Sequence, residues 1–118
     1  MKIILTLTAL GLLLTACSTT TSDASIQRQL VGVWTSDSHP GQVIEERSDG
    51  ITVLRINGKE TDKGRWLVSN GYEVIGPLGD WSRVNSALLE SNKVLSISGD
   101  KAVFLTPDGR TETYHKQR

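Results

Sequence analysis

The sequence has little of several features that define common classes of protein. Its 118 residues include one cysteine, two histidines, three prolines and only 5% aromatic residues, and 13 basic residues balance 13 acidic ones. A single cysteine cannot form an intramolecular disulfide. The balanced charge argues against a nucleic-acid partner, because such binding needs a basic stripe to displace counterions. The length allows one domain rather than two.

The sequence also has no apolar run that is long enough to cross a membrane as a helix. Its most apolar segment, residues 3–14, contains 12 uncharged residues and follows the positive start Met1-Lys2. A spanning helix needs ~20 apolar residues, whereas runs of ~10–14 residues fit the core of a signal peptide. We therefore interpret residues 1–16 as an export signal.

This signal ends at Leu14-Thr15-Ala16-Cys17, which resembles the lipobox of bacterial lipoproteins. The resemblance implies that a diacylglycerol is attached to the sulfur of Cys17, that the chain is cut before this residue, and that its new amino group is acylated. These acyl chains would anchor the protein firmly. Ser18 in place of aspartate implies sorting to the outer membrane, on the periplasmic side. The alternative is an ordinary secretory signal followed by a free thiol.

After the cysteine, residues 17–25 are small and polar without periodicity, which predicts a flexible tether. The body, residues 26–118, contains recurring Asn-Gly and Asp-Gly pairs, which supply the positive φ angles that tight hairpins need. The stretches between these turns alternate partly between apolar and polar residues. This pattern predicts an antiparallel meander of short strands at 31–36, 42–47, 51–56, 64–69, 72–75, 83–90, 94–98, 101–106 and 111–115.

Two segments of the body have helical spacing. Residues 24–30 predict a short helix that Ser25 could cap, and residues 82–89 allow a helix, although we favour a strand there. So many short strands in an open sheet would leave exposed edges. We therefore expect an all-β fold, closed as a small antiparallel barrel or packed as a tight sandwich, with a short N-terminal helix.

Gly32 and Trp34 follow the predicted helix directly and resemble the Gly-x-Trp opening of lipocalin-like barrels. Two residues apart on a strand, they share one face of the sheet. The resemblance implies that the tryptophan fills the closed end of the barrel beneath a basic residue from the last strand. Arg110 and Lys116 are the two candidates for this cation–π contact.

A second Gly-x-Trp, formed by Gly64 and Trp66, lies between an Asp-Gly and an Asn-Gly turn. Small lipocalin-like domains of bacterial lipoproteins look similar in this arrangement. Classical lipocalins are longer, however, and their second motif around Thr-Asp-Tyr is absent here. We therefore expect the interior to be filled by its own side chains rather than to form a deep ligand cup.

The remaining candidate residues do not predict catalysis. Trp34 and Trp66 are interpreted as core residues, and Trp81, which follows a Pro-Gly-containing loop, is the candidate for an exposed partner contact. A metal site built from Asp37, His39 and Glu45, or a serine nucleophile beside His39, has no supporting motif.

Glu45 and Glu46 are adjacent on a predicted strand and therefore point to opposite faces, so they cannot act as an acid/base pair. We expect no enzyme activity, no metal and no cofactor. The predicted function is that of a lipid-anchored barrel that binds a small apolar ligand or has a structural role beside the membrane. The alternative is a protein-binding module, such as an inhibitor of an envelope enzyme or an immunity protein.

Overall fold

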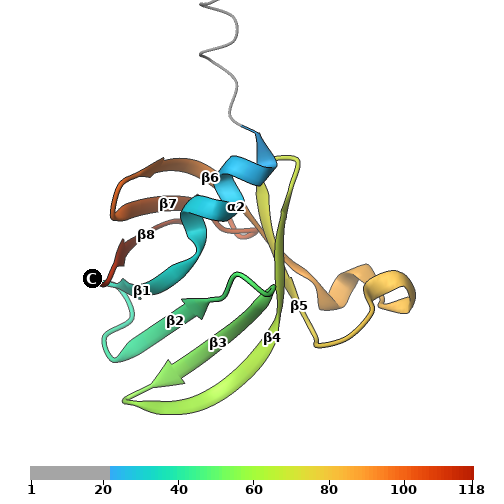
Figure 1. The fold of residues 1–118 in the computed structure, drawn as a ribbon, viewed down its shortest axis with the longest axis horizontal. Coiled ribbons are helices and arrows are strands. Elements are labelled where there is room, and N and C mark those ends of the chain that lie inside the picture. Colours follow the sequence, from blue (N-terminus) through green and yellow to red (C-terminus); the bar gives the residue numbers. More distant parts are fainter. Residues whose placement is uncertain (1–21) are drawn as a thin grey trace, which may run out of the picture.

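Eight antiparallel strands follow one another around a closed barrel in the computed structural model, which describes residues 22–118 (Figure 1). The strands are β1 (Gly32–Ser36), β2 (Gln42–Glu46), β3 (Ile51–Ile56), β4 (Lys59–Ser69), β5 (Tyr72–Gly76), β6 (Glu90–Ser98), β7 (Lys101–Leu105) and β8 (Thr111–Lys116). Each strand pairs with the next one along the chain, and β8 returns to pair with β1 through Trp34 and Lys116. The predicted all-β meander is confirmed, and it closes as a barrel rather than as a sandwich.

Two of the predicted hairpin turns show why the strands reverse where they do. Asn57 and Gly58 join β3 to β4 with φ angles of 51° and 82°, and Asn70 and Gly71 join β4 to β5 with φ angles of 53° and 81°. Two successive residues with positive φ form the tight turn whose twist matches that of the flanking strands. The Asn-Gly pairs therefore fix the register of both hairpins.

A helix, α2 (Asp23–Leu30), closes one end of the barrel. Its N-cap is Ser22, whose hydroxyl accepts a hydrogen bond from the Ser25 backbone, so the expectation that Ser25 caps the helix is wrong. The Asp23 carboxylate accepts hydrogen bonds from the Asn70 and Gly71 backbone amides, at 2.8 and 2.9 Å. Residues 23–25 therefore belong to the folded barrel, and the predicted tether is too long at its C-terminal end.

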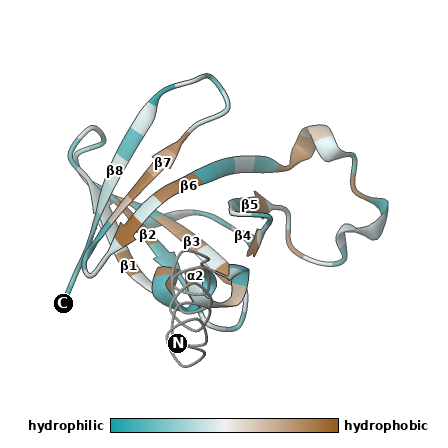
Figure 2. Ribbon diagram, turned by 90° about the horizontal axis from the view of Figure 1, so that it is seen from above, coloured by the Kyte–Doolittle hydropathy of each residue, from teal (hydrophilic) through white to brown (hydrophobic). Residues whose placement is uncertain are grey.

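The segment predicted as a strand at 83–90 is a loop instead. Residues 77–89 connect β5 to β6 through two 3-10 turns, η1 (Trp81–Arg83) and η2 (Ser86–Leu88). The side chains of Asp80 and Asn85 accept hydrogen bonds from backbone amides two residues further on, at Ser82 and Ala87. Such local bonds compete with a strand ladder. The barrel therefore has eight strands rather than nine, and the loop projects from its side (Figure 2).

The core lies at the end of the barrel that α2 covers. Six buried residues form one cluster there: Leu30, Trp34, Trp66, Val68, Ala102 and Phe104. The Gln27 side chain of α2 also accepts a hydrogen bond from the Val68 backbone amide at 3.0 Å, which fixes the helix against β4. In the part of the chain that the structure describes, no helix has the length and hydrophobicity needed to span a bilayer.

Candidate functional site

The interior of the barrel contains a cavity of about 950 Å³, open at the end opposite α2. Its apolar walls include Ile44, Leu54, Ile75 and Phe104. The mouth is bordered by the β1–β2 turn, the loop of residues 77–89 and the β7–β8 turn, which contribute His39, Pro77, Leu78, Leu88, Pro107 and Asp108. The expectation that side chains fill the interior is therefore wrong, because α2 closes only one end and the core occupies only that end. We call this cavity the cup.

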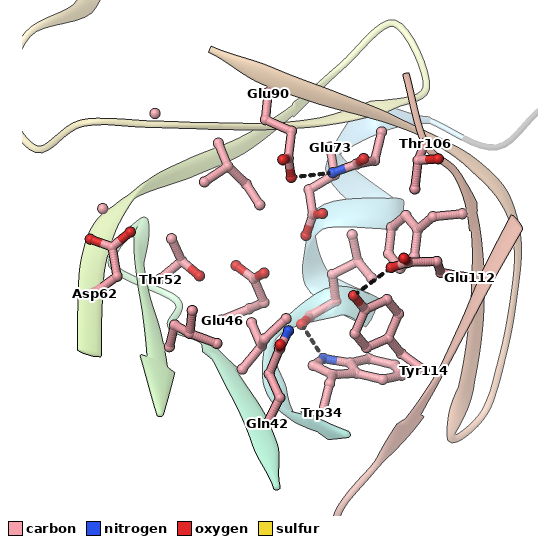
Figure 3. A pocket seen from close by; sticks show the side chains of 18 of the residues that line it. Trp34, Gln42, Glu46, Thr52, Asp62, Glu73, Glu90, Thr106, Glu112 and Tyr114 are labelled. Carbon is pink, nitrogen blue, oxygen red and sulfur yellow. Dashed lines mark hydrogen bonds between the residues drawn. The ribbon is translucent and has the colours of Figure 1, made fainter. Parts of the chain in front are cut away.

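The floor of the cup is polar. Glu46 and Thr52 are cross-strand partners on β2 and β3, and Glu73 and Asn92 are partners on β5 and β6. All four are buried and line the cup. Figure 3 shows the Glu46 and Glu73 side chains directed toward the middle of the cavity, with α2 behind them.

Burial sets the protonation of the two floor carboxyls. It raises the pKa of Glu46 from 4.5 to about 10, and repulsion by the neighbouring Glu73 carboxylate reinforces the shift. Burial also raises the pKa of Glu73. At neutral pH Glu46 therefore carries a proton when no cation lies beside it. The Oε2 atom of Glu46 is buried, and it has no hydrogen-bond partner within 3.5 Å among residues 22–118.

Two further carboxylates line the cup above this floor. Glu90 accepts a hydrogen bond from the Asn92 amide at 3.1 Å. Glu112 has more partners. The Tyr114 hydroxyl donates a hydrogen bond to it at 2.9 Å, and nitrogen atoms of His39 and Arg110 lie 3.3 and 3.4 Å from its carboxylate. Its negative charge is therefore compensated at the mouth, whereas that of Glu90 has no cation within 4 Å among residues 22–118.

The first Gly-x-Trp forms the closed end of the barrel. The indole N–H of Trp34 donates to the Leu30 carbonyl at 2.8 Å, and the Lys116 ammonium lies 5.0 Å from the ring centroid. Lys116 also donates to the Gln29 carbonyl at 2.9 Å, which links β8 to α2. A Cβ on Gly32 would lie 3.0 Å from Lys116 Cε, so the glycine makes room for the lysine side chain.

Arg110 was the other candidate for the contact with Trp34, and this assignment is wrong. Its guanidinium binds Asp108 at 2.7 Å and approaches Glu112 from the β7–β8 turn. That turn lies at the mouth of the cup, at the opposite end of the barrel from the ring of Trp34. Lys116, at the end of β8, is the residue that covers the tryptophan.

The second Gly-x-Trp, Gly64 and Trp66, positions β4 against β5 and against the β2–β3 turn. A Cβ on Gly64 would lie 2.5 Å from the Gly76 carbonyl oxygen, so only glycine allows this approach of β4 to β5. The Trp66 ring is buried in the core, and its indole N–H donates to the Arg47 carbonyl at 2.9 Å. Both residues are structural, and Gly64 also lines the cup.

Trp81 is half-buried and holds the projecting loop against the barrel. Its indole N–H donates to the Pro77 carbonyl at 2.7 Å, and the Arg65 guanidinium lies 5.0 Å from the ring centroid. A Cβ on Gly76 would lie 2.9 Å from the ring. Trp81 is therefore less exposed than a free partner contact requires, whereas Leu78 and Leu88 of the same loop are 52% and 67% exposed.

The histidines pair with separate carboxylates. His39 faces Glu112, and His115 lies 3.5 Å from Asp37. Glu45 binds Arg55 at 3.0 Å on the outside of the barrel. Within residues 22–118, no three histidine, cysteine or acidic side chains form a group that could hold a metal ion.

Sequence reasoning missed the floor of the cup, although a signal for it was present. Glu46 is in phase with Ile44 on β2, and Glu73 is in phase with Ile75 on β5, so each lies on the same face as an apolar neighbour. Cys17 lies outside the described residues. Comparison with family models, with curated proteins and with solved structures gives no match for this chain.

Proposed function

We propose that this protein is a non-enzymatic, lipocalin-like barrel that binds a small molecule in its cup. The observation that carries the proposal is the cavity of about 950 Å³ inside a barrel that α2 closes at one end. Small-molecule sites have volumes of roughly 300–1,000 Å³, with mostly apolar walls and a few buried polar groups. The cup combines such walls with the polar floor of Glu46 and Glu73.

A substitution that fills the cup tests this function. Leu54→Trp adds a large ring to the wall and should weaken binding of a neutral solvatochromic dye, such as Nile red, by at least about tenfold in a fluorescence titration. Leu95 is exposed on β6 and does not line the cup, so Leu95→Trp is the matched control. Equal dye binding by both variants and the unmodified protein would place the dye outside the cup and contradict the proposal.

The proposal extends to the location of the protein in the cell. Leu14-Thr15-Ala16-Cys17 supports lipid attachment at Cys17, and Ser18 supports the outer membrane, with the barrel on its periplasmic side. Cys17→Ser should release the protein from the membrane fraction. Retention of this variant in washed membranes would overturn the lipid anchor without affecting the proposed role of the cup.

A second candidate function is a protein-binding module, which the exposed apolar residues Leu78 and Leu88 favour. Both side chains border the mouth of the cup. If a protein partner binds there, the double variant Leu78→Ser/Leu88→Ser should lose that partner in co-purification from envelope membranes, and Leu95→Ser should keep it. A partner that both variants retain would argue against this surface.

A further inference from the structure

The floor of the cup and the wall just above it contain carboxyl groups that have no cation beside them. Among residues 22–118, no lysine, arginine or histidine nitrogen lies within 4 Å of the carboxyl groups of Glu46, Glu73 or Glu90. The basic residues that line the cup, His39, Lys63 and Arg110, come from the β1–β2 turn, from β4 and from the β7–β8 turn. His39 and Arg110 are engaged with Glu112.

Glu46 has an unused binding atom in this acidic site. Its side chain belongs to a residue that is only 4% exposed, it points into the cup, and its Oε2 atom has no hydrogen-bond partner among residues 22–118 (Figure 3). A buried carboxyl oxygen without a partner is costly, and native proteins rarely leave one. A donor group on a bound ligand would satisfy it.

We propose that the ligand of the cup is a protonated amine with an apolar body, and that its ammonium group binds between Glu46 and Glu73. This inference rests on the proposed function of the cup. An ammonium group donates three hydrogen bonds and accepts none, which matches a floor of carboxyl oxygens. The apolar body would lie against Ile44, Leu54 and Phe104, between this floor and the mouth.

The shape of the site favours an organic cation over a metal ion. No group of three metal-binding side chains exists in the part of the chain that the structure describes. The walls between the floor and the mouth include the apolar side chains of Ile44, Leu54, Ile75 and Phe104, and a hydrated metal ion gains nothing from such side chains. An organic cation with an apolar body can contact both the carboxyl groups of the floor and the apolar side chains of the walls.

Proton release should accompany binding, because the raised pKa of Glu46 keeps this carboxyl protonated when no cation lies beside it. The ionisable groups that line the cup with it are Asp62 and Lys63 on β4, Glu73 on β5, Glu90 on β6, and Glu112 and Tyr114 on β8, with His39, Asp108 and Arg110 at the mouth. An ammonium group stabilises the ionised carboxylate and displaces its proton. Amine affinity should therefore rise with pH, while the affinity of a neutral ligand should not.

Three probes with the same apolar body separate charge from hydrophobic binding: phenylbutylamine, phenylbutanol and phenylbutyrate. We would titrate each by calorimetry into the full-length protein in phosphatidylcholine nanodiscs at neutral pH. The amine should bind at least about tenfold more tightly than the alcohol, and the carboxylate should bind most weakly. Repeating the amine titration in buffers of different ionisation enthalpy should reveal the released proton.

Glu46→Gln and Glu73→Gln keep the shape of the side chain and remove its charge. Each should abolish most of the preference for the amine while leaving alcohol binding unchanged, which also shows that the variant is folded. Glu60→Gln is the matched control, because Glu60 is exposed on β4 and does not line the cup. Equal binding of all three probes would overturn the charge inference but support the cup, whereas binding of none would overturn both.

Discussion

At the scale of single residues, Glu46 has a strongly perturbed pKa. It is the last residue of β2, where alternation turns its side chain inward, while its neighbour Glu45 pairs with Arg55 outside. Burial beside Glu73 makes the charged form unfavourable and raises the pKa of Glu46 to about 10. The proposed binding of a cation would offset this cost, because a cation beside the carboxyl stabilises its charged form.

This perturbed carboxyl predicts how stability depends on pH. The folded state holds a proton on Glu46 at pH values where the unfolded chain has lost it, so stability is full below about pH 4.5 and falls as pH rises toward 10. One such group contributes a slope of at most about 1.4 kcal/mol per pH unit. Urea unfolding at a series of pH values should show this decline, and Glu46→Gln should make it shallower. The same slope in both proteins would contradict the assignment.

A second prediction at this scale concerns Lys116. Its ammonium both covers the Trp34 ring and donates to the Gln29 carbonyl, so Lys116→Met should cost about 1–2 kcal/mol in the free energy of unfolding. Lys101→Met is the control, because Lys101 is exposed on β7. Urea unfolding checks both variants. If their midpoints shift equally, the contact with Trp34 has no energetic role.

At the scale of elements, the strands and tight turns were predictable because their signals are local. Asn57-Gly58 and Asn70-Gly71 define two hairpins, and alternation defines the strands that they join. The first part of the loop, before Trp81, was predictable from its proline and glycine, but residues 83–89 were not, because Val84, Leu88 and Leu89 resemble part of a strand. There the side chains of Asp80 and Asn85 bind nearby amides instead.

The floor of the cup shows a second feature that local sequence patterns could not predict. Local alternation places Glu46 and Glu73 on inward faces, but they come from β2 and β5, which are not adjacent in the barrel. Whether two such residues meet across the interior depends on the stagger of the strands around the whole barrel. Stagger is a global property that no short pattern encodes. For the same reason the sequence did not decide whether Arg110 or Lys116 reaches Trp34.

The position of α2 depends on a small number of contacts, which gives a prediction for this element. Asp23→Ala removes the acceptor of two backbone amides in the β4–β5 turn and should cost about 1–2 kcal/mol. Hydrogen exchange at Asn70 and Gly71 should become faster while the β2–β3 hairpin stays protected. Asp37→Ala is the control, since the Asp37 side chain is 94% exposed. Unchanged exchange in Asp23→Ala would show that these two hydrogen bonds do not hold the helix in place.

At the scale of the whole molecule, the closed end of the barrel lies nearer in the chain to the proposed anchor at Cys17 than the open end does. The helix begins at Asp23, six residues after Cys17, and a chain of that length spans at most about 20 Å. The helix covers the end of the barrel that contains the β2–β3 and β4–β5 turns. The mouth of the cup lies at the other end, beside the β3–β4 turn.

If Cys17 carries the lipid, this geometry predicts that the closed end faces the membrane and that the cup opens into the periplasm. Ser48 in the β2–β3 turn and Lys59 at the start of β4 lie at opposite ends of the barrel, and both are exposed. Nitroxide labels at Ser48→Cys and Lys59→Cys, in protein anchored to vesicles, should differ in collision with paramagnetic probes. The label at 48 should collide more with lipid-soluble oxygen, and the label at 59 should collide more with a water-soluble nickel complex. The reverse pattern would place the mouth on the bilayer, and the ligand would then be taken from lipid rather than from the aqueous periplasm.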